Sequence, residues 1–119
     1  MTENFKPTTC VVITPHMPPS YAPVVFAKGD RVIIEKRDTD WPEFLWCIDE
    51  EGAAAWIPEK YLERDDDVGI LNTAYSSVEL KADKGEQLSI IKSEAGWHWC
   101  RNSKGKLGWI PDRTVKLKK

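Results

Sequence analysis

The sequence contains one pattern twice, and this duplication limits its possible folds more than any other feature. The segment FLWCIDEEGAAAWIP, residues 44–58, aligns without a gap with residues 97–111 at a shift of 53. A Trp-Cys pair, a glycine and the run Trp-Ile-Pro coincide in the two copies. A chain that repeats such a pattern is expected to build one supersecondary unit twice.

A second matching block lies upstream in each copy. KGDRVII at residues 28–34 aligns with KGEQLSI at residues 84–90, here at a shift of 56. The first copy therefore has three extra residues between the two blocks, and such insertions fall in surface loops. The sequence predicts two domains, at 8–64 and 68–117, joined by the acidic residues 65–67. We call these ranges the first and the second repeat.

Each repeat has the pattern of short strands. Lys-Gly turn signals precede two β-branched and apolar runs, and the tight-turn sequences DEEG and NSKG each follow an aromatic-rich run. Proline cannot donate to a strand ladder, so a third strand ends at Pro58 or at Pro111. The predicted strands include residues 31–36, 44–49, 87–92 and 97–102. The fold class predicted is all-β, with two tandem small five-stranded barrels.

Alternation along the central strand separates two faces. Trp97 and Trp99 share one face, and His98 and Cys100 share the other, because successive strand side chains point in opposite directions. In the first repeat the corresponding sets are Phe44 with Trp46, and Leu45 with Cys47. The small and apolar set is expected to face the core, so we predict that the aromatic set faces outward. Exposed aromatic residues grouped on one face indicate a binding surface.

Charge and cysteine content exclude several classes of protein. The chain has 17 basic and 19 acidic residues, a balance unlike the basic excess of nucleic-acid binders. No apolar run approaches the length of a membrane helix, and the N-terminal residues lack the pattern of a signal peptide. Three cysteines without a CxxC motif suit a reducing compartment. We expect a cytoplasmic protein without nucleic-acid or membrane partners.

The chemistry-bearing residues favour packing over catalysis. Cys47 and Cys100 occupy equivalent core-facing positions, which suits small buried residues rather than nucleophiles. His98 is expected to be partly buried and hydrogen-bonded, because no four ligands stand at the spacing of a zinc site. No nucleophile with a base, phosphate loop or acid/base pair is evident, so the sequence predicts neither an enzyme nor a cofactor.

The ordered blocks resemble Src-homology-3 (SH3) domains, present twice. ELKADKGEQLSII, GWHWC and GKLGWIPDRTV are similar to three successive family motifs, and VVFAKGDRVII, FLWC and AAAWIPEKYLE repeat them. The resemblance covers residues 10–117 and is strongest to prokaryotic variant SH3 proteins built as tandem pairs. It implies a groove that binds extended peptides. The segment PHMPPSYAP takes the position of the family's RT loop, and an internal proline-rich ligand is the alternative for it.

The resemblance implies a peptide-binding site on the aromatic face of each repeat. In the second repeat the matching positions are Trp97, Pro111 and Tyr75, with Trp109 in the same GWIP motif. In the first repeat they are Phe44, Pro58 and Tyr61, with Trp41 in the longer loop. Thr114 replaces the groove tyrosine in the second repeat.

The function expected is a non-enzymatic binding module that docks an extended proline-containing or apolar segment of a peptide or protein ligand. Two alternatives stay open. The aromatic faces could pack against each other or against another copy in a structural scaffold, or they could bind cell-wall glycans.

Overall fold

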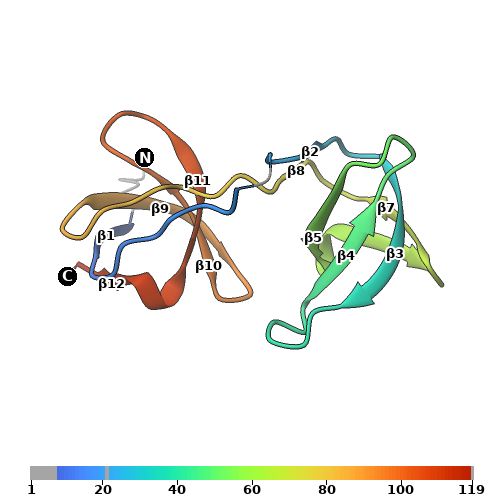
Figure 1. Cartoon of the computed structure of the whole chain (residues 1–119), viewed down its shortest axis with the longest axis horizontal. Helices are drawn as coiled ribbons and strands as arrows, with labels where there is room; N and C mark the ends of the chain where they lie inside the picture. Colours follow the sequence, from blue (N-terminus) through green and yellow to red (C-terminus); the bar gives the residue numbers. More distant parts are fainter. Residues whose placement is uncertain (1–7, 21, 119) are drawn as a thin grey trace, which may run out of the picture. The chain divides into compact units, whose positions relative to one another are not determined.

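The computed structural model describes residues 8–20 and 22–118 of the chain. The predicted all-β class is confirmed, because the described strands form antiparallel sheets of five, two and five strands (Figure 1). The helical segments within the described residues are two short 3-10 turns, Glu59–Tyr61 and Asp112–Thr114. The chain divides into two compact units, each treated separately below.

Unit 2 comprises described residues 22–78 and holds one of the five-stranded sheets. Its strand order is β5-β4-β3-β7-β6, and β2 pairs with β8 in the two-stranded sheet. The strands are β2 (Val25–Phe26), β3 (Arg31–Arg37), β4 (Phe44–Ile48), β5 (Ala54–Pro58), β6 (Leu62–Asp65), β7 (Val68–Leu71) and β8 (Tyr75–Ser76).

Unit 1 comprises described residues 8–20 and 79–118 and holds the other five-stranded sheet. Its strand order is β11-β10-β9-β1-β12, so β1, the first described strand, lies between β9 and β12 (Figure 1). The strands are β1 (Thr8–Val12), β9 (Gln87–Glu94), β10 (Trp97–Arg101), β11 (Leu107–Pro111) and β12 (Val115–Leu117).

The units do not coincide with the predicted ranges 8–64 and 68–117. The number of units agrees with the prediction. However, the first strand of each repeat, β1 in the first and β7 in the second, pairs with strands of the other repeat. β1 of the first repeat pairs with β9 and β12 of the second repeat. β7 of the second repeat pairs with β3 and β6 of the first repeat. Unit 2 is therefore continuous in the sequence, and it lies between the two sequence segments that make up unit 1.

The acidic residues 65–67 do not link two domains. Asp65 ends β6, and Val68, which begins β7, is its cross-strand partner. Asp66 has a φ of 59°, in the left-handed region that aspartate tolerates better than most residues. The acidic run is thus the turn of a hairpin inside unit 2.

The turns between the central hairpin strands form as predicted. Asp49 Oδ1 accepts hydrogen bonds from the N–H groups of Glu51 and Ala53, both at 2.9 Å. In unit 1, Asn102 Oδ1 accepts from Lys104 at 2.9 Å and from Lys106 at 3.0 Å. A side chain that bonds its own turn in this way replaces backbone partners lost at the bend.

Each unit has its own apolar core. Leu45, Cys47 and Cys100 are buried, which confirms that this side of the central strands faces inward. The buried core of unit 1 consists of Cys10, Val12, Leu80, Ala82, Leu88, Cys100, Ile110 and Val115. In unit 2 the buried hydrophobic residues include Phe26, Val32, Ile34, Leu45, Cys47, Ile57, Leu62 and Leu71.

Candidate functional site

The strongest candidate site in unit 1 lies around Trp97 at the start of β10. Trp97 is opposite Pro111 in the register between β10 and β11. Its indole meets the His16 ring edge-on, with 6.0 Å between ring centroids. His16 Nε2 lies 2.8 Å from Glu79 Oε1. We call His16, Glu79, Trp97 and Pro111 the Trp97 cluster. It combines a half-buried indole with one carboxylate, which suits a ligand that is apolar and carries a positive charge.

Two extended segments bring His16 and Glu79 to this position. His16 and Ala82 exchange backbone hydrogen bonds of 2.9 and 3.0 Å, so the segments after β1 and before β9 run antiparallel. The Leu80 N–H donates to Trp109 O at 2.9 Å and fixes the second segment against β11. A Cβ at Gly108 would lie only 2.8 Å from the Leu80 nitrogen, so this approach requires glycine.

The equivalent residues of unit 2 are buried aromatic side chains and a proline. Phe44 is opposite Pro58 in the register between β4 and β5. The Tyr61 and Tyr75 rings meet edge-on with 5.4 Å between centroids, and the Tyr75 hydroxyl donates to Trp56 O at 3.0 Å. We call Phe44, Pro58, Tyr61 and Tyr75 the Phe44 cluster. Its three rings are each less than a tenth exposed, which suits packing better than docking.

The structure corrects the predicted place of Tyr75. We expected this residue beside Trp97, but it lies in unit 2 because β7, which precedes it, pairs with β3 and β6. His16 takes the corresponding place in unit 1, because β1 precedes it there. Sequence reasoning missed His16, since its partner Trp97 belongs to the other repeat. Trp41 lies in the loop before β4, where its carbonyl accepts from the Phe44 N–H at 2.9 Å.

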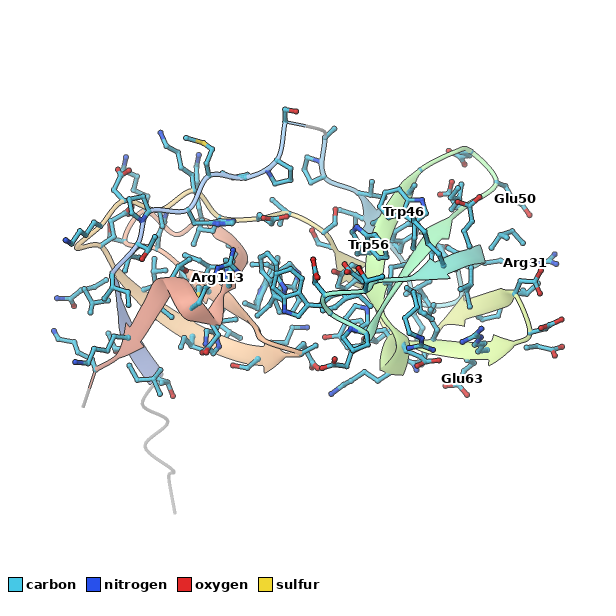
Figure 2. The ribbon with its side chains drawn as sticks, turned by 60° about the horizontal axis from the view of Figure 1, so that its bottom comes forward. Arg31, Trp46, Glu50, Trp56, Glu63 and Arg113 are labelled. Carbon is cyan, nitrogen blue, oxygen red and sulfur yellow. The ribbon has the colours of Figure 1, made fainter. Side chains whose placement is uncertain are left out.

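Paired tryptophans occur on the outer face of both sheets. Trp46 and Trp56 meet edge-on with centroids 5.1 Å apart (Figure 2), and Trp99 and Trp109 do so at 5.2 Å. Repeat-equivalent lysines cover them, with Lys36 Nζ 5.8 Å from the Trp56 ring and Lys92 Nζ 5.7 Å from the Trp109 ring. Each cation–π contact of this kind contributes about 0.5–1 kcal/mol at an exposed site.

The prediction of an outward aromatic face is therefore only partly right. Trp46, Trp97 and Trp99 are half-buried rather than exposed. Phe44 is 8% exposed and Trp109 is 5% exposed. The alternation rule placed these rings on the side opposite Leu45, Cys47 and Cys100, but it did not predict how far they are buried.

His98 is hydrogen-bonded through both ring nitrogens, as expected of a partly buried histidine. Nδ1 lies 2.6 Å from Ser93 Oγ, and Nε2 lies 2.6 Å from Asp112 Oδ1. The Asp112 N–H also donates to Gly96 O at 2.9 Å. These hydrogen bonds tie β9 and β10 to the 3-10 turn that follows β11.

All three cysteine thiols are buried in the unit cores. Burial raises the pKa of Cys47 to about 12 and that of Cys100 to about 12. It also raises the pKa of Cys10, whose thiol is a hydrogen-bond partner of Cys100. Because the thiolate is the nucleophile and the metal ligand, these side chains are inert packing groups at neutral pH.

The cysteines are expected to resist a thiol reagent in the folded protein. Modification by 5,5′-dithiobis(2-nitrobenzoate) at pH 8 should be at least roughly 100-fold slower than in denaturant, because it requires opening of a unit. The raised pKa values of these folded-state thiols also predict how their contribution to the free energy of unfolding depends on pH. That contribution is fully present below about pH 8.5 and declines above it, where the thiols of the unfolded chain ionise. Reaction of Cys10, Cys47 or Cys100 in native buffer at the rate measured in denaturant would contradict the predicted protection.

Two further features of the described residues concern metals and membranes. Across 8–20 and 22–118, no group of three or more His, Cys, Asp or Glu side chains is placed to hold a metal ion. In the same part of the chain, no helix has the length and apolar character that crossing a membrane would need.

Comparison with known proteins adds no family assignment. No protein-family model matches the sequence, and no curated protein matches it.

Proposed function

We propose that the chain is a non-enzymatic tandem SH3-like binding module, and that the Trp97 cluster of unit 1 docks an extended peptide. The ligand is a proline-containing or apolar segment. A polyproline II segment is already extended, so ordering it on the protein costs little conformational entropy.

One observation carries this proposal. The half-buried Trp97 indole lies opposite Pro111 and against His16, and the Glu79 carboxylate is bonded to His16. An aromatic ring next to a proline and a carboxylate is the chemistry that binds apolar segments with a basic flank. The resemblance of GWHWC and GKLGWIP to SH3 motifs supports the same site.

The Phe44 cluster supports a structural role for the corresponding face of unit 2. Phe44, Tyr61 and Tyr75 are each less than a tenth exposed, and the Tyr75 hydroxyl is bonded to a backbone carbonyl. A ligand would have to displace these packed rings. The two faces are thus proposed to differ, with one for docking and one for packing.

Titration of the full chain with proline-containing peptides tests the proposal. Amide shifts and tryptophan fluorescence should respond around Trp97 and His16, and Trp97→Ala should weaken binding at least about tenfold, since interface tryptophans are often hot spots. Trp46→Phe is the matched control, because Trp46 is a half-buried indole outside the cluster, and it should leave affinity unchanged. Shifts confined to the Phe44 cluster, or no response to any peptide, would show that the proposed site is wrong.

A further inference from the structure

Each unit needs one first strand, and each repeat supplies one. In unit 1, β1 places Cys10 opposite Leu88. In unit 2, β7 places Gly69 opposite Val32, which is the repeat equivalent of Leu88. Cys10 and Gly69 therefore occupy the same position in two similar sheets, and either strand could pair by its backbone in either sheet.

The core-facing side chains of the two strands differ in size at two positions. β1 presents Cys10 and Val12, which are 0% and 1% exposed. β7 presents Gly69 and Leu71, and Leu71 is 1% exposed. One strand thus carries two medium-sized residues, and the other carries the smallest residue and a larger one.

A side chain at the position of Gly69 would be crowded in unit 2. A Cβ built there would lie 3.3 Å from Ile34 Cδ1, 3.3 Å from Leu62 Cδ2 and 3.4 Å from Val32 Cγ2. A cysteine would add its sulfur to this crowded site, whereas valine in place of Leu71 would leave a gap. In unit 1 the misfit is reversed, because glycine would leave a void beside Cys100 and leucine would overfill the place of Val12. Both kinds of misfit destabilise a close-packed core.

We propose that Cys10 with Val12, and Gly69 with Leu71, determine which first strand each unit accepts and so hold the two repeats in the exchanged arrangement. The first strand that a unit accepts also decides which aromatic residue joins the cluster of that unit. His16 follows Cys10 at the same spacing as Tyr75 follows Gly69. The strand that carries Cys10 therefore delivers a histidine to Trp97, and the strand that carries Gly69 delivers a tyrosine to Tyr61.

A four-residue exchange in the full chain tests whether these residues select the first strand of each unit. The variant C10G/V12L/G69C/L71V gives each strand the core-facing residues of the other. We expect its first strands to change places, so that nuclear Overhauser contacts of residue 10 move from Leu88 to Val32. The His16 contact with Trp97 should be lost at the same time. The matched control V11I/I70V exchanges the neighbouring residues, which do not belong to the buried core, and should keep the original contacts. If the four-residue variant keeps β1 on β9, the proposal is wrong.

A second variant covers the case in which the four-residue exchange does not fold. Gly69→Ala adds only the Cβ that meets Ile34, Leu62 and Val32. It should lower the denaturant midpoint of unit 2 and leave that of unit 1 in place. An unchanged midpoint for unit 2 would show that volume at this position does not select the strand.

Discussion

Removal of residues 1–12 is expected to unfold unit 1, which ends at the C-terminus, and to leave unit 2 folded. β1 lies between β9 and β12 in the middle of the unit 1 sheet. Its loss takes Cys10 and Val12 from the core. It also leaves β12 without its strand partner and leaves β9 paired on one side alone, with β10. Burial of a valine side chain such as that of Val12 contributes about 1.5–3 kcal/mol, and small domains have only about 5–15 kcal/mol of total stability.

Assigned amide spectra of the truncated chain measure this effect. Signals of residues 87–117 should collapse toward random-coil positions, whereas those of residues 31–71 should stay dispersed. Val11→Thr in the full chain is the control, because Val11 lies on the same strand outside the buried core. Contiguous domains at 8–64 and 68–117 would give the reverse pattern, with the first repeat unfolded and the second intact.

The second large effect concerns fragments of the chain. A fragment of residues 22–78 contains every strand of the unit 2 sheet together with β2 and β8. It should fold as a monomer with one cooperative unfolding transition, as most small domains do. A fragment of residues 8–67 spans the first repeat but lacks β7. Only β1 could fill the vacant position, and Cys10 would then meet the side chains that crowd Gly69.

We therefore expect the 8–67 fragment to be unfolded or strongly destabilised under conditions in which the 22–78 fragment is native. Circular dichroism and urea unfolding at equal concentration compare the two directly. A stable 8–67 fragment beside an unfolded 22–78 fragment would contradict the exchanged arrangement.

Local features of the fold follow well from the sequence. Strands end at Pro58 and Pro111, as the missing N–H of proline requires. Asp49 and Asn102 form the predicted turns through their side chains. The burial of Cys47 and Cys100 follows from alternation along the central strands. The strand ends, the turns and the alternation all depend on residues that are close together in the sequence, and the repeated pattern makes these local features visible.

The strand exchange could not be predicted in this way. Both first strands satisfy the same local pattern, and the choice between them rests on packing among residues far apart in the sequence, such as Gly69 with Ile34. The place of Tyr75 and the role of His16 follow from that choice. The burial of Phe44 and Trp109 was missed for a related reason, since alternation gives the direction of a side chain but not what covers it.

The most direct test of the exchanged arrangement is a nuclear Overhauser measurement on the intact wild-type chain. The structure predicts cross-strand contacts of Cys10 with Leu88 and Leu117, and of Gly69 with Val32 and Arg64. Contacts of Cys10 with Val32 and Arg64, and of Gly69 with Leu88 and Leu117, would show instead that each repeat folds on its own first strand.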